Sequence, residues 1–169
     1  MNFLLRGLGL LATAVALSAA ESALKITAPA KSLEFTLEEF ALLPHREIAA
    51  VEPHGKKEHH YAGVSVAELL SRAGAPLGEN LRGPALQLVV IVHSKDGYAV
   101  AFSLTEFDKA FGDRTILLAD REDGQVLPEN AAPFRLVVVG DKRAARWARM
   151  VSSIELVAVD SSPAAKGKP

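Results

Sequence analysis

The sequence LQLVVIVHSKDGYAVAF occupies residues 86–102. Its first seven residues are mostly apolar and β-branched, which is typical of a strand buried on both faces. The Asp96-Gly97 pair is a strong turn signal, and residues 98–102 alternate in the manner of a second strand. The stretch therefore predicts two strands joined by a tight turn.

The same stretch runs into one of three similar patterns that predict helix starts. Residues 35–40, 64–69 and 102–107 each place a Ser or Thr after an apolar residue and a Glu three positions later. This is the pattern of a capping box with a hydrophobic staple. Further apolar runs predict strands at residues 33–35, 46–51, 115–119, 134–139 and 154–159. With roughly seven strands and three or four short helices, we expect an α+β single domain built around one mixed β-sheet.

The first twenty residues have the composition of a secretory signal peptide. Met1–Arg6 carries one positive charge, Leu8–Leu17 is apolar but shorter than the ~20 residues that span a bilayer, and Ser18-Ala19-Ala20 suits signal peptidase. The alternative is a short membrane anchor. We expect a signal peptide at 1–20, the domain at 21–160 and a disordered tail at 161–169, which is small and polar. The mature protein would then be periplasmic or secreted, without membrane insertion.

Charge and cysteine content exclude several classes of function. Without Arg6, the 19 Lys and Arg become 18 against 20 Asp and Glu, a net charge of −2 for residues 21–169. This balance gives no electrostatic reason to bind nucleic acid. The sequence contains no cysteine, which excludes disulfides, thiolate catalysis, zinc–cysteine sites and iron–sulfur clusters.

Candidate ligand-binding residues lie in two segments of the second half of the chain. Lys142, Arg143 and Arg146 follow Gly140 at the end of an expected strand, and guanidinium groups match phosphate or sulfate oxygens. The alternative is a solvated basic turn that pairs with Asp141. Trp147 can stack on a flat ligand or belong to the core. In the other segment, Asp96 and Tyr98 flank the turn glycine and can reach a ligand.

A third candidate is a group of histidines. His54, His59 and His60 lie within seven residues, and neutral imidazoles bind divalent metals. Adjacent His59 and His60 would point to opposite faces of a strand, and Lys56-Lys57 would repel a cation. The alternative to a metal site is an exposed hydrophilic hairpin.

Five passages of the sequence, taken in order, resemble the molybdopterin-binding domain of sulfite oxidase-type oxidoreductases. They are YAGV with LLSRAG (61–64 and 69–74), DGYAVAFSL (96–104), ILLA with DGQVLP (116–119 and 123–128), PFRLVVVG (133–140), and RW with IEL (146–147 and 154–156). The resemblance implies the sulfite oxidase-like fold and a pterin-binding role for the basic turn after Gly140. In that family a loop cysteine holds molybdenum, and this sequence has no cysteine, with only residues 51–60 in the corresponding region.

Two main hypotheses for the function follow from this resemblance. The first is a molybdopterin-dependent oxidoreductase-like domain that binds a pterin cofactor, or a similar anionic ligand, in the periplasm. The second is a non-catalytic exported domain that keeps the fold without the cofactor and binds a small anion, a heterocycle or an envelope protein partner. Fold resemblance alone does not establish a reaction, so the sequence leaves open whether the protein is an enzyme.

Overall fold

The expected pair of strands forms as β5 (Leu88–Ser94) and β6 (Ala99–Ser103), which are antiparallel neighbours. The turn between them contains Gly97 at φ +87°, a backbone conformation that favours glycine. The computed structural model describes residues 21–159. The expected signal peptide and C-terminal tail lie outside these residues.

Sheet A contains five strands in the order β2-β1-β10-β5-β6. Beside β5 and β6 it includes β1 (Leu24–Thr27), β2 (Ser32–Phe35) and β10 (Val151–Ala158). The pair β1–β10 is parallel and the other pairs are antiparallel, so the sheet is mixed as expected.

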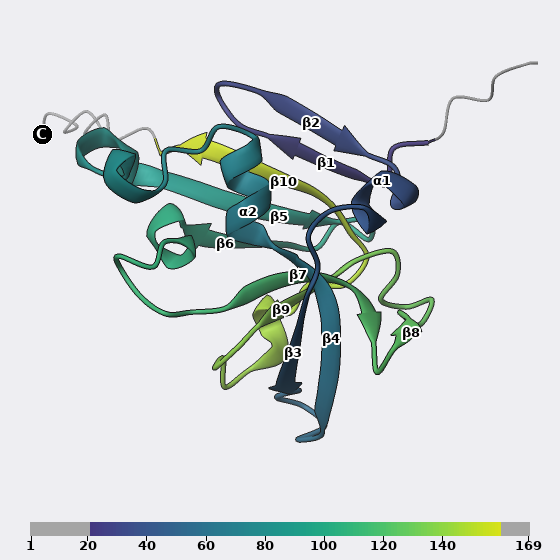
Figure 1. Cartoon of the computed structure of the whole chain (residues 1–169). Helices are drawn as coiled ribbons and strands as arrows, with labels where there is room; N and C mark the ends of the chain where they lie inside the picture. The colour runs from purple at the N-terminus through teal and green to yellow at the C-terminus, as the bar shows by residue number, and fades with distance from the viewer. Residues whose placement is uncertain (1–20, 160–169) are drawn as a thin grey trace, which may run out of the picture.

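Sheet B is centred on β7 (Ile116–Glu122), which pairs with β4 on one side and with β9 and β8 on the other. β3 pairs with β4 as the outer strand. The bounds of these strands are β3 (Arg46–Val51), β4 (Glu58–Ser65), β8 (Gln125–Val126) and β9 (Arg135–Val138). In Figure 1 the β3–β4 hairpin extends away from sheet A, below the rest of the molecule.

The α+β single-domain prediction is confirmed, but the expectation of one sheet is wrong. The described strands form two sheets, and one hydrophobic cluster contains residues of both, such as Val90 and Ile154 from sheet A and Leu118 and Leu136 from sheet B. Two sheets that share a core each bury one apolar face. The apolar runs predicted the strands but not which strands would pair.

The helices are short, and they lie between strands. In the described part of the chain, two are α-helices, α1 (Leu37–Ala41) and α2 (Val66–Arg72), and four are 3₁₀ turns: η1 (Gly78–Asn80), η2 (Gly83–Gln87), η3 (Leu104–Phe107) and η4 (Ala144–Arg146). Within residues 21–159, none of the helices has the length and apolar character needed to cross a membrane.

Only the first of the three predicted capping boxes forms its hydrogen bonds. The hydroxyl of Thr36 accepts from the backbone N–H of Glu39, whose carboxylate accepts from the Thr36 N–H. α2 also begins where predicted, but without a side-chain cap bond. The third box starts the 3₁₀ turn η3 without a side-chain cap bond: the Ser103 hydroxyl contacts that of Thr105, and the Glu106 carboxylate accepts from Arg114 and Arg146.

Candidate functional site

A cavity of about 620 Å³ lies where three distant chain segments meet, and we call it the basic pocket. The segments are the loop between β3 and β4, the turn between β5 and β6, and residues 142–149 after β9. Its charged lining residues are Arg135, Lys142, Arg143, Arg149 and Asp96. Glu52 and Glu122 compensate Arg135, and the remaining three cations against Asp96 make the pocket attractive to an anion.

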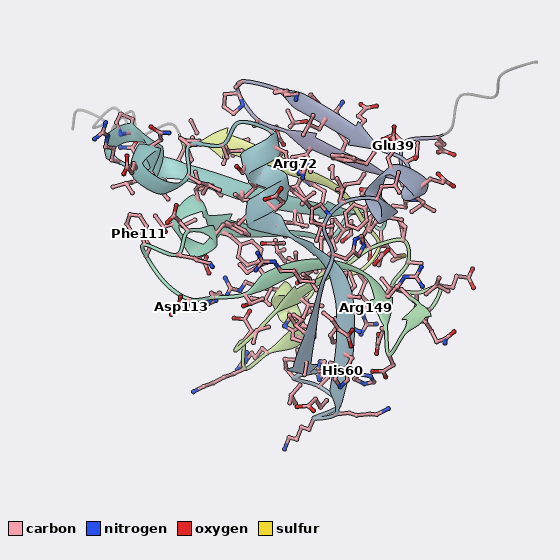
Figure 2. The ribbon with its side chains drawn as sticks, viewed as in Figure 1. Glu39, His60, Arg72, Phe111, Asp113 and Arg149 are labelled. Atoms are coloured by element: carbon pink, nitrogen blue, oxygen red, sulfur yellow. The ribbon has the colours of Figure 1, made fainter. Side chains whose placement is uncertain are left out.

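Three of the four cations are available to a ligand. Lys142 and Arg143 are exposed, and neither forms an ion pair with any residue in the range 21–159. Arg149 lies 3.8 Å from Glu52, a long contact that leaves most of its donors free. Figure 2 shows Arg149 beside sheet B, in the region between β4 and β8. An anion in the basic pocket would therefore meet Lys142 and Arg143 without displacing a protein carboxylate.

Arg135 differs from these cations because it is buried and paired. Its side chain is 6% exposed and bonds to Glu52 at 2.5 Å and to Glu122 at 3.4 Å. Its guanidinium carbon lies 5.5 Å from the ring centroids of both Tyr61 and Trp147. The Nε atom of Arg135 finds no hydrogen-bond partner among the described residues. Arg135 thus contributes to the floor of the pocket a buried positive charge that two carboxylates compensate.

The ionisation of the groups around Arg135 follows from burial and from its charge. Burial opposes ionisation of Glu52, but the hydrogen bond and the charge of Arg135 outweigh it and lower the pKa of Glu52. Burial raises the pKa of Tyr61 to about 12, so the phenol is neutral at physiological pH. The buried guanidinium of Arg135 therefore lies beside an ionised Glu52 and a neutral phenol.

Tyr98 and Trp147 use their polar atoms within the protein. The Tyr98 hydroxyl donates to the carbonyl of Ala145 at 2.6 Å, and the indole N–H of Trp147 donates to the carbonyl of Val138 at 3.0 Å. Asp96 accepts from the backbone N–H of Tyr98 at 2.9 Å. All three predicted residues line the basic pocket, but Trp147 is 4% exposed and belongs to the hydrophobic core, whereas Tyr98 is exposed.

Arg146 is the one predicted anion-binding residue that does not line the pocket. It bonds to both carboxylate oxygens of Asp141, at 2.7 and 2.8 Å, and to Glu106 at 3.0 Å. Its guanidinium carbon lies 4.7 Å from the ring centroid of Phe102. The structure therefore brings Lys142 and Arg143 together with Asp96, Tyr98 and Trp147 around the pocket. The side chain of Arg146 instead bonds to Asp141 and Glu106.

The three predicted histidines do not meet at one point. His54 lines the basic pocket, whereas His60 is exposed on β4 and lies 3.3 Å from Glu47 (Figure 2). His59 contacts Glu122 at 3.1 Å and Asp123 at 2.8 Å, and possible ligand atoms of these three residues lie within 4.8 Å of one another. The guanidinium of Arg135 bonds to Glu122 and would oppose a cation there.

Sequence reasoning missed Arg135 and its partner Glu52. The signal was an arginine at the start of the apolar run Phe134–Val139, where a buried charge requires a carboxylate partner. The identity of that partner was hidden, because Glu52 lies 83 positions earlier in the chain.

Comparisons with known proteins add a family and a fold. The family model described as "Oxidoreductase molybdopterin binding domain" matches residues 12–164. No curated protein sequence matches the chain. Among solved structures, the sulfane dehydrogenase SoxCD from Paracoccus pantotrophus is similar, with a TM-score of 0.61 and 21% identity. The match covers 84% of this chain but only 40% of that chain, so the likeness shows the fold of part of a larger protein.

Proposed function

Because the chain belongs to the oxidoreductase molybdopterin-binding domain family, we propose that its basic pocket binds the phosphate end of a pterin cofactor or a similar anionic ligand. The observation that carries this proposal is the pair Lys142 and Arg143, which face the pocket without a carboxylate partner among residues 21–159. Charge-assisted hydrogen bonds from such cations to phosphate are among the strongest polar contacts.

The residues of the pocket fit one end of such a cofactor. Lys142, Arg143 and Arg149 suit a phosphate, and the exposed ring of Tyr98 suits contact with a flat heterocycle. The metal end does not fit in the same way, because the chain has no cysteine to bind molybdenum. When bound, a molybdenum cofactor supplies oxidation–reduction chemistry, and the residues of this chain would hold and orient its organic part.

We also propose that the protein acts in the periplasm. Support comes from residues 1–20, whose charge, apolar run and small residues suit a cleaved signal peptide. N-terminal sequencing of the protein from the periplasmic fraction should begin at Glu21. A protein that keeps Met1 and stays in the cytoplasm would contradict this proposal.

Calorimetric titration of the mature protein tests the binding proposal. The ligands are a pterin that carries a phosphomonoester, the same pterin without the phosphate, and inorganic phosphate. We expect the phosphorylated pterin to bind most tightly, with an affinity that falls as salt is added, because the contact is ionic. The double variant Lys142→Gln/Arg143→Gln should lose about 30-fold in affinity, since each lost charged hydrogen bond costs about 1 kcal/mol or more.

The control is Arg82→Gln, which removes an exposed positive charge near η2 and should leave the affinity unchanged. Equal binding of the phosphorylated and unphosphorylated pterins would show that the cations do not recognise the phosphate. Absence of binding to all three ligands would favour a domain that keeps the fold without the cofactor.

A further inference from the structure

Four charged residues form ion pairs within and beside the segment of residues 140–147, which presents Lys142 and Arg143 to the basic pocket. We call these the Arg146 network: Glu106 from η3, Arg114 from the segment before β7, and Asp141 and Arg146 from the segment itself. Arg146 bonds to Asp141 and Glu106, and Arg114 bonds to the same two carboxylates at 3.1 and 3.2 Å. Two cations and two anions thus form a closed set of ion pairs.

The geometry leaves Arg146 little capacity to bind a ligand. Its Nε and one terminal nitrogen bond to Asp141, its other terminal nitrogen bonds to Glu106, and its planar group lies over the Phe102 ring. The fork geometry of arginine matches this arrangement, and lysine could not reproduce it. The pKa of Arg146 is raised above its ordinary value, first by the hydrogen bonds to Asp141, so the group stays charged.

The network is partly shielded from water, which distinguishes it from an ordinary surface ion pair. The side chain of Asp141 is 12% exposed, those of Glu106 and Arg146 are 27% and 30% exposed, and that of Arg114 is 39% exposed. Exposed ion pairs contribute little, whereas networks with good geometry and partial burial hold their members more firmly. The segment is also held at Ala145 by the Tyr98 hydroxyl and at Trp147 by the Val138 carbonyl.

We propose that Arg146 is a positioning residue, and that the Arg146 network holds residues 140–147 in the shape that directs Lys142 and Arg143 into the basic pocket. Side chains along this segment separate by role: Asp141 and Arg146 join the network, and Lys142 and Arg143 line the pocket. A binding site that is ordered before the ligand arrives loses less entropy on binding. This inference rests on the proposed function for its effect on affinity, but the order of the segment can be measured without any ligand.

The test compares network variants with pocket variants of the mature protein. Hydrogen exchange of the amides of residues 141–147 and the fluorescence of Trp147, the only tryptophan, report on the segment, and titration with the phosphorylated pterin reports on affinity. We expect Arg146→Gln to speed amide exchange in the segment and shift the Trp147 emission. It should also weaken binding about tenfold, as expected for the loss of one strongly coupled ion pair.

Conservative variants separate a positioning role from a general loss of structure. Arg146→Lys keeps the charge and should restore part of the affinity and part of the exchange protection. Glu106→Gln removes one carboxylate partner of Arg146 and should speed amide exchange and weaken binding less than Arg146→Gln does. This variant keeps the test informative if Arg146→Gln folds poorly. Lys142→Gln/Arg143→Gln should weaken binding without changing amide exchange, and Arg82→Gln should change neither property.

Two results would overturn the proposal. If Arg146→Gln weakens binding while exchange and fluorescence stay as in the wild type, Arg146 contacts the ligand directly. If exchange in residues 141–147 is unaffected by Arg146→Gln and by Glu106→Gln, the network does not hold the segment. The second result would contradict the positioning role even if the wild-type protein binds none of the pterins. Absence of pterin binding would count against the proposed function and not against the positioning role.

Discussion

Arg135 is the residue whose environment shapes the floor of the basic pocket. A guanidinium that is 6% exposed is costly to bury unless carboxylates pair with it, and Glu52 and Glu122 do so from two different strand ends. Its contact with Glu52 also ties the β3–β4 loop, which carries His54, to strand β9. Removal of one partner would leave part of a buried charge uncompensated.

Glu52→Gln should therefore lower the free energy of unfolding by roughly 2 kcal/mol at pH 7, with Glu122 left to pair Arg135. Folding lowers the pKa of Glu52 below its ordinary value of 4.5, so the native state releases this proton more readily than the unfolded state. The stabilisation is present above pH 4.5 and is lost as the pH falls through the lowered pKa. Urea unfolding at several pH values should show the difference between wild type and Glu52→Gln shrinking below pH 4.5. A difference that stays constant down to pH 2 would contradict this account.

Strand β4 joins the outer strand β3 to the rest of sheet B, since it pairs with β3 on one side and β7 on the other. The β4–β7 pairing shifts in register between Ala62 and Gly63. At Gly63 the backbone of β7 comes so close that a Cβ atom would lie 2.1 Å from the carbonyl oxygen of Leu118. Such a contact is far inside van der Waals distance, so one strand would have to move.

Gly63→Ala should destabilise the fold by about 3 kcal/mol, because the added methyl group forces β4 and β7 apart. Gly112→Ala is the matched control: a Cβ there meets nothing within 4 Å, and the backbone is not in the left-handed region. It should change stability by about 0.5 kcal/mol at most. Thermal and urea unfolding of both variants measure the effect. Equal stability of Gly63→Ala and wild type would mean that the two strands are not so closely packed.

The elements that sequence predicted well are those with local signals. The Asp96-Gly97 turn and the Thr36–Glu39 capping box are decided within a few residues, and both form. β4 was missed because Glu58, His59 and His60 give its first half no apolar pattern, and it becomes a strand only through its two neighbours. The predicted helix after Ser103 is a 3₁₀ turn whose Glu106 carboxylate bonds to Arg114 and to Arg146, 40 positions away, and that second pairing has no local sequence signal.

In the candidate site, too, sequence predicted the residues with local signals and missed those whose partners are far away in the chain. The sequence indicated Lys142 and Arg143 as anion-binding candidates, because cations after a glycine at a strand end suit a phosphate, and both line the basic pocket. Glu52 and Arg135 could not be paired from sequence, since no local pattern connects positions 83 residues apart. The role of Arg146 likewise depends on Glu106, which lies 40 positions away.

At the scale of the whole molecule, overall charge says little about binding. The chain has a formal net charge of −1, yet the fold gathers four cations and one carboxylate around one cavity. Two sheets that share a core bring the β3–β4 loop, the β5–β6 turn and the segment after β9 to the same place. A ligand there would contact three parts of the chain at once, which rigid strands on both sheets hold in position.

The most direct test of pterin binding is the pterin content of the protein isolated from its native host, in cells shown to make the cofactor. The sample would be oxidised and its pterin fluorescence measured beside its molybdenum content, for the wild type, Lys142→Gln/Arg143→Gln and Arg82→Gln. We predict near-stoichiometric pterin in the wild type and in Arg82→Gln, and a marked loss in the double variant. Wild-type protein without pterin, or a double variant that retains it in full, would contradict the assignment of the basic pocket as the binding site.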